Sequence, residues 1–298
     1  MVEQFHRPAT LREALRLKRL LKTKSAYLAG GTFVNSKDFS LRPAHLISLD
    51  GLASAEGLGR IEAKAGRVVV GALCTIQQLI ESETVPAPLR AAAARVSSRN
   101  VRNAATLGGH LAANKSCSDL IPMLIALGAK VQVSGAGRAK IVAVDEHLGS
   151  SGDLLITRII VPKLARGRTA AGRNLRASAN ALSVLNVAAS FQLSKTGCVE
   201  APVVVLAGRS YRALRLTAVE LELEGKPLPP IDELQGRLLK RLGPLLKPGA
   251  CRASCVCPCP KNDLGGSVEF KQYQAAALLA QTLVQVRDEL VARSGGRS

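Results

Sequence analysis

Two glycine pairs stand where the backbone could hold an anion. The first is the sequence AGGT at residues 29–32, directly after a β-like run, and the second is TLGGH at residues 106–110. Glycine has no Cβ, so its backbone can approach a ligand closely, and consecutive N–H groups can form a concave binding site for phosphate oxygens. Thr32 and Thr106 would add hydroxyl donors without adding charge. Two such loops facing each other could hold the two phosphates of a dinucleotide, although a single glycine pair more often marks a turn.

Four of the seven cysteines crowd into nine residues near the C-terminus. These four are Cys251, Cys255, Cys257 and Cys259. Thiolates at this density could hold zinc, copper(I) or an iron–sulfur cluster, whereas Pro258 and Pro260 stiffen the segment and hinder its wrapping around one ion. The segment therefore predicts either a metal or cluster site or an exposed, oxidation-prone loop. The other cysteines stand alone among apolar or small residues and are expected to be ordinary buried or half-buried side chains.

Motifs of several familiar enzyme classes are absent from the sequence. No Gly-x-Gly-x-x-Gly lies between a strand and a helix, which argues against a Rossmann fold, and no P-loop motif occurs. The four histidines form no His-Glu-x-x-His pattern, and there is no Gly-x-Ser-x-Gly elbow. A hydrolase is therefore disfavoured.

The chain carries a large excess of positive charge. Its 298 residues include 41 Lys and Arg against 22 Asp and Glu, a net charge of +19. Such an excess suggests an anionic partner, such as nucleic acid, a membrane surface or a phosphate-bearing ligand. A capping box at residues 10–13 opens a strongly basic helix, but no aromatic side chain interleaves its charges for base stacking. A solvated helix face is therefore favoured over a nucleic-acid contact.

Length and composition indicate a two-domain protein of the cytoplasm. About 150 residues per domain gives two domains here, and 47% hydrophobic residues are enough for packed cores. The first residues lack the apolar core of a signal peptide, and the apolar stretches at residues 68–76 and 120–129 are too short to span a bilayer. We therefore expect a soluble, cytoplasmic protein with neither a membrane nor nucleic acid as a partner.

The hydrophobic pattern predicts mixed helices and strands. β-like runs closed by glycine, proline or turn residues are expected at residues 25–29, 45–49, 68–70, 130–134, 140–144 and 154–161. Helices are expected at residues 75–82, 87–98 and 119–127, with Asp119 placed to favour the start of the last one. Because helices and strands do not alternate strictly, the predicted fold class is α+β.

The C-terminal part is expected to form a smaller unit of its own. After a junction at residues 163–172, strands at 182–193 and 199–206 flank a turn signal at Lys195-Thr-Gly197. Helices are expected at residues 217–224, 231–246 and 268–290. This pattern predicts a short sheet packed with helices.

The two glycine motifs in this order, followed by DLIP at residues 119–122, resemble the FAD-binding (medium) subunit of molybdenum hydroxylases. That family includes the flavoproteins of xanthine dehydrogenase and carbon monoxide dehydrogenase. The resemblance also covers FHRP at 5–8, LRPAHLISL at 41–49, VRN at 101–103 and GSVEFKQY at 266–273, so it runs along nearly the whole chain. It implies an FAD-binding domain of the p-cresol methylhydroxylase type at residues 1–165, made of two α+β subdomains at about 1–55 and 56–165. A C-terminal domain like that of the CO dehydrogenase flavoprotein, a small antiparallel sheet with helices, would span residues 170–292.

The resemblance also implies which residues contact FAD. They are Ala29, Gly30, Gly31, Thr32, Thr106, Leu107, Gly108, Gly109, His110 and Asp119. The two glycine loops would hold the pyrophosphate, and Asp119 matches an acidic position associated with FAD binding. Neither a catalytic side chain nor a metal ligand is assigned. The chain departs from the family at His110, where relatives often have Asn, Asp or Glu, and at residues 33–36, where FVNS replaces an Asp-Leu-Leu-Pro-like run.

The function that the resemblance implies is electron relay in an oxidoreductase. A molybdopterin-binding large subunit would oxidise the substrate, and a [2Fe–2S] small subunit would pass electrons to FAD on this chain, which would reduce NAD or another acceptor. Two alternatives stay open: a non-catalytic basic binding module without flavin, and a stand-alone flavin reductase. In the relay interpretation the net charge of +19 is dispersed surface Lys and Arg rather than the phosphate site.

Overall fold

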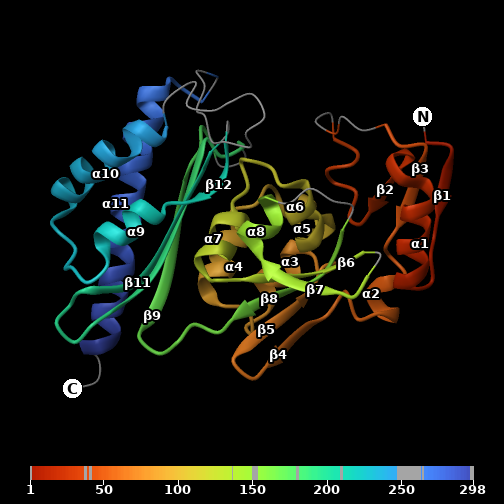
Figure 1. Cartoon of the computed structure of the whole chain (residues 1–298), viewed down its shortest axis with the longest axis horizontal. Coiled ribbons are helices and arrows are strands. Elements are labelled where there is room, and N and C mark those ends of the chain that lie inside the picture. Colours follow the sequence, from red (N-terminus) through yellow and green to blue (C-terminus); the bar gives the residue numbers. More distant parts are fainter. Residues whose placement is uncertain are drawn as a thin grey trace. The chain divides into compact units, whose positions relative to one another are not determined.

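The computed structural model describes residues 2–36, 39, 42–135, 137–149, 154–178, 181–208, 211–246, 263 and 265–295. Cys251, Cys255, Cys257 and Cys259 lie outside the described residues, so the choice between a metal or cluster site and an exposed, oxidation-prone loop stays open. The chain divides into two units, Met1–Asn114 with Ala129–Lys163 and Lys115–Gly128 with Leu164–Ser298 (Figure 1). The family boundaries at residues 165 and 170 likewise stay a prediction. Within the described ranges, no helix is both long and apolar enough to cross a membrane.

A small parallel sheet opens the first unit. Its strands are β1 (Gln4–His6), β3 (His45–Ser48) and β2 (Ser25–Leu28), in that order. Helix α1 (Leu11–Leu21) provides the crossover between β1 and β2, and its apolar face buries Ala14 against Ile47. Thr10 caps α1 by accepting the Glu13 N–H at 3.2 Å, as the capping box predicts. The basic residues on the outer side of α1 are mostly exposed, which agrees with a solvated face.

The rest of the first unit is built on an antiparallel sheet of five strands. Their order is β4 (Ile61–Lys64), β5 (Arg67–Gly71), β8 (Leu155–Pro162), β6 (Lys130–Ser134) and β7 (Lys140–Ala143). The helices of this part are α2 (Leu52–Ala55), α3 (Ile76–Glu81), α4 (Ala87–Ala94), α5 (Arg99–Ala104), α6 (Leu107–Ala113) and α8 (Val144–Gly149). Both glycine motifs therefore belong to this unit: the first follows β2, and the second forms the start of α6.

The helix expected at residues 87–98 is wrong at its C-terminal end. Helix α4 stops at Ala94, and Ser97 adopts a left-handed φ of 44°. The guanidinium of Arg102 donates to the carbonyl oxygens of Val96 at 3.1 Å and Ser97 at 2.9 Å. This long-reaching side chain satisfies carbonyls that would otherwise lack partners, so the chain can turn there and start α5.

The second unit is an antiparallel sheet covered by helices on both faces. The strand order is β12 (Tyr211–Arg215), β11 (Val199–Gly208), β10 (Leu185–Leu193) and β9 (Arg168–Leu175). The helices are α7 (Leu120–Ala126), α9 (Thr217–Leu223), α10 (Ile231–Leu245) and α11 (Val268–Gly295). Alternate residues of β10, among them Leu185 and Val187, join the core shared with α10 and α11, whereas Ser190 on the opposite face donates to the Ala126 carbonyl of α7.

Two features of this unit differ from the sequence expectation. The junction expected at residues 163–172 contains the start of β9, which pairs with β10 along its length. The segment Lys115–Gly128, which the sequence analysis placed in the first domain, belongs to the second compact unit because every residue of α7 is buried against this sheet. The turn at residues 195–197 is as predicted, with Gly197 at a φ of 79°.

Candidate functional site

The first glycine motif leaves three backbone donors free. Gly31 has a φ of +70°, the left-handed region that favours glycine, and its carbonyl accepts the Asn35 N–H at 3.0 Å. This bond tightens the turn that follows β2. Within the described residues, the N–H groups of Gly30, Gly31 and Thr32 make no hydrogen bond to the protein. Three consecutive donors on a glycine turn are therefore available to an anion.

The second motif uses most of its backbone donors internally. Thr106 is the N-cap of α6, and its Oγ1 accepts the Gly109 N–H at 3.1 Å. The N–H of Leu107 donates to the Cys74 carbonyl at 2.9 Å, and that of Gly108 donates to the Ala72 carbonyl at 2.8 Å. These bonds correct the expectation of consecutive free donors in this loop. The second motif therefore offers a ligand a hydrogen-bonded backbone surface and the Thr106 hydroxyl, and not a row of free N–H groups.

The two motifs lie against each other, as the sequence analysis expects. A Cβ on Gly30 would lie 1.7 Å from the Ala104 carbonyl oxygen, and a Cβ on Gly109 would lie 4.0 Å from the Cβ of Ala29. Only glycine at position 30 permits this approach. Gly108 is likewise required by packing, since a Cβ there would lie 2.6 Å from the Cβ of Ala72.

Nine of the ten candidate residues are therefore brought together in the first unit. Thr106, Leu107 and Gly108 are buried, whereas Gly109 and His110 are half-buried and Thr32 is exposed. The His110 N–H donates to the Thr106 carbonyl at 2.9 Å, within the first turn of α6. Burial thus decreases from the anchored start of α6 toward the free donors of the first motif.

Asp119 lies in the second unit, inside a polar cluster. Its carboxylate pairs with Arg176 at 2.6 Å and accepts hydrogen bonds from Asn174 at 2.9 Å and Ser183 at 2.8 Å. The side chains of Asp119 and Arg176 are only 10% and 12% exposed. Asp119 does not cap α7 with its side chain; the neighbouring Ser118 Oγ accepts the Ile121 N–H instead. The observed contacts of this carboxylate are structural ones.

The main-chain anchors of the second motif could not be predicted from the sequence. Ala72, Cys74 and Ala104 contribute carbonyl groups, and a carbonyl contact leaves no signal in residue type. Among the described residues, no group of three or more His, Cys, Asp or Glu side chains could hold a metal ion.

Thr106→Val is expected to lower the free energy of unfolding by about 1 kcal/mol, because the α6 N-cap hydroxyl is lost while the side-chain shape is kept. Urea unfolding followed by circular dichroism measures this change. Thr106→Ser keeps the hydroxyl and serves as the matched control. A Val variant as stable as the Ser variant would contradict the capping role.

Cys74 is expected to resist alkylation in the folded protein. The side chain is buried, and desolvation raises the pKa of its thiol to about 11. At pH 8 only about one thiol in a thousand would be ionised, and the thiolate is the reactive form. Mass-spectrometric peptide mapping after brief iodoacetamide treatment should find Cys74 unmodified in native protein and modified in denaturant. Native labelling of Cys74 as rapid as that of half-buried Cys198 would disprove the burial effect.

Comparisons with known proteins agree with this fold. The model of the family described as "FAD binding domain in molybdopterin dehydrogenase" matches residues 1–164. The uncharacterized protein YgfM of Escherichia coli K12 is 30% identical over 280 residues, covering 94% of this chain and 95% of that protein. The carbon monoxide dehydrogenase medium chain of Hydrogenophaga pseudoflava is 26% identical, with 94% and 95% covered. A solved chain of that organism's carbon monoxide dehydrogenase superposes with a TM-score of 0.82 at 24% identity, covering 96% of this chain and 97% of the other.

The family model and the α+β fold together define a flavoprotein chain, and in it two glycine loops face each other. More narrowly, the chain belongs to the family of FAD-binding domains of molybdopterin dehydrogenases, and it is the flavoprotein subunit of an oxidoreductase with FAD as its cofactor. The free donors of Gly30, Gly31 and Thr32 on a glycine turn fit a pyrophosphate. This membership favours the flavoprotein over the flavin-free basic module.

Proposed function

We propose that this chain relays electrons within a molybdenum hydroxylase complex. Its partners would be a molybdopterin-binding large subunit and a [2Fe–2S] small subunit, and its acceptor would be NAD or another oxidant. When bound, FAD would supply the redox chemistry between the iron–sulfur centre and that acceptor. The observation that carries the proposal is the pair of facing glycine loops with three free N–H donors.

The residues of this chain would position the cofactor rather than react with it. The N–H groups of Gly30, Gly31 and Thr32 would donate to pyrophosphate oxygens, and the hydroxyls of Thr32 and Thr106 would add neutral donors. Because Gly30 has no Cβ, its main chain can lie against that of Ala104. Gly108 can lie against Ala72 for the same reason. No side-chain general base is needed for these tasks.

Whether the protein binds FAD can be tested directly on purified protein. We expect a yellow protein whose heat-released flavin is FAD and not FMN, as identified by chromatography. Colourless protein that also fails to bind added FAD would contradict the proposal. The comparison protein is the Gly30→Ala variant described in the Discussion, which should be colourless.

The relay itself requires two further observations. Affinity purification from the native host should recover a molybdenum-containing chain and a two-cluster iron–sulfur chain in stoichiometric amounts. Anaerobic addition of NADH should bleach the flavin if NAD is the acceptor, because electron transfer is reversible in direction. Purification of an active flavin reductase without partners would favour the stand-alone alternative. An intact complex whose flavin NADH does not reduce would point to another acceptor.

A further inference from the structure

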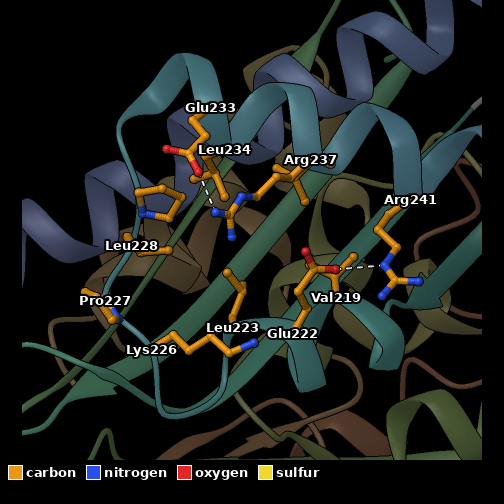
Figure 2. Close-up of a pocket in the computed structure, with 12 residues that line it drawn as sticks. Val219, Glu222, Leu223, Lys226, Pro227, Leu228, Glu233, Leu234, Arg237 and Arg241 are labelled. Carbon is orange, nitrogen blue, oxygen red and sulfur yellow. Dashed lines mark hydrogen bonds and ion pairs between the residues drawn. The ribbon is translucent and has the colours of Figure 1, made fainter.

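We propose that the second unit carries a separate ligand site for a small monoanionic carboxylate with an apolar body. The site is a pocket between α9 and α10, closed on one side by the loop at residues 224–230 (Figure 2). Its volume is about 360 Å³, within the range of about 300–1,000 Å³ typical of small-molecule sites. All of its lining residues belong to the second unit, whereas both glycine motifs belong to the first.

The floor of the pocket is apolar and belongs to the core of the second unit. Val219, Leu223, Leu234 and Leu238 are each at most 7% exposed and belong to the core of the unit. Leu228 is half-buried and packs against the same core from the loop. These side chains offer an alkyl or aryl group a surface without polar atoms, so the body of the ligand would gain by leaving water.

The loop wall is held in place without a ligand. Gly225 adopts a φ of +72° and donates its N–H to the Val199 carbonyl at 2.9 Å, while the Val199 N–H donates to the Lys226 carbonyl at 2.9 Å. Pro227 and the proline pair at residues 229–230 fix further backbone angles. A wall that is already ordered costs little conformational entropy when a ligand binds.

The rim leaves one positive charge without a partner. Glu222 pairs with Arg241 at 2.7 Å, and Glu233 pairs with Arg237 one helical turn along α10 (Figure 2). The Lys226 ammonium makes no ion pair or hydrogen bond within the described part of the chain. Three cations and two carboxylates therefore leave a net charge of +1 among the charged lining residues.

The net charge of +1 at the rim favours a ligand with a single negative charge. A monoanion would neutralise the rim, and its head group could accept hydrogen bonds from Lys226 and from unused guanidinium N–H groups. A dianion such as a phosphate monoester would meet the carboxylates of Glu222 and Glu233 with an excess negative charge. An apolar floor beneath a rim of charge +1 thus fits a medium-chain or aromatic carboxylate.

Calorimetric titration of the full chain with octanoate tests the site. We expect saturable binding at one site, with octan-1-ol and octylamine at least about fivefold weaker, as expected for a solvent-exposed ion pair. Lys226→Gln should weaken octanoate about fivefold and leave octan-1-ol unchanged. Lys195→Gln removes the same charge from an exposed turn of the same unit and should change neither.

A second variant separates the pocket from other surfaces. Leu228→Trp should fill the pocket and abolish saturable octanoate binding while the FAD content and the circular dichroism spectrum stay unchanged. The proposal is overturned if octylamine binds as tightly as octanoate, if Lys226→Gln or Leu228→Trp leaves octanoate affinity unaltered, or if no saturable binding occurs. FAD content is measured on the same samples. A failure of the FAD proposal can therefore be distinguished from a failure of the carboxylate-site proposal.

Discussion

Gly30→Ala is expected to remove most of the FAD that the purified protein retains. The added Cβ would lie 1.7 Å from the Ala104 carbonyl oxygen and 2.7 Å from its carbon. The opposing atoms are main chain and cannot rotate away as a flexible side chain would, so the two glycine loops must separate. Separation misplaces the donors of residues 30–32 relative to Thr106. We expect the flavin-to-protein ratio after gel filtration to fall about tenfold or more, a change of at least about 1.4 kcal/mol in binding free energy.

The matched control is Gly137→Ala in the same unit. A Cβ at Gly137 would meet nothing within 4 Å, and this glycine does not have a positive φ. Its flavin content should equal that of the unaltered protein. Circular dichroism of both variants separates a local change at the loops from unfolding of the unit. A folded Gly30→Ala protein with full flavin content would rule out the facing loops as the FAD site.

The strands that the sequence predicts best are those whose own residues favour extended structure. Val68–Val70 and residues 154–161 are rich in β-branched side chains, and both form strands of the five-stranded sheet. Strand β9 was missed because its sequence, RTAAGRNL, contains a single β-branched residue. It is extended because β10 pairs with it, with Ala188 opposite Gly172. Such a strand forms because of its tertiary pairing, and the residue pattern of a single sequence does not indicate that pairing.

The candidate site, like the fold, could be predicted from the sequence only in part. The residue types of the two motifs indicate loops that could hold the two phosphates of a dinucleotide if they face each other, because close backbone approach requires glycine. That both loops hold one pyrophosphate is what the family resemblance implies. Which N–H groups stay free could not be predicted, since the anchors of α6 are carbonyls of Ala72 and Cys74 on another segment. The partners of Asp119 were equally hidden: Arg176 lies 57 residues away in sequence.

Asp119→Ala is expected to lower the free energy of unfolding of the second unit by about 3–5 kcal/mol. The substitution leaves the Arg176 guanidinium, 12% exposed, without its carboxylate partner, and it removes an acceptor from Asn174 and Ser183. An uncompensated charge in this setting costs more than the hydrogen bonds alone. Urea unfolding followed by circular dichroism measures the loss, and the double substitution Asp119→Ala with Arg176→Met should recover most of it because the orphaned charge is gone.

The same variants decide whether Asp119 also contacts FAD, as the family resemblance implies. If the carboxylate acts on FAD directly, the double variant will be stable yet poor in flavin, because the charge pair has been replaced but the FAD contact has not. If Asp119 serves only the polar cluster, the double variant will regain flavin together with stability. Asp119→Asn keeps the shape and one acceptor oxygen, so its stability should lie between those of the unaltered protein and Asp119→Ala. An Asp119→Ala protein as stable as the unaltered one would show that the pair with Arg176 does not hold this cluster together.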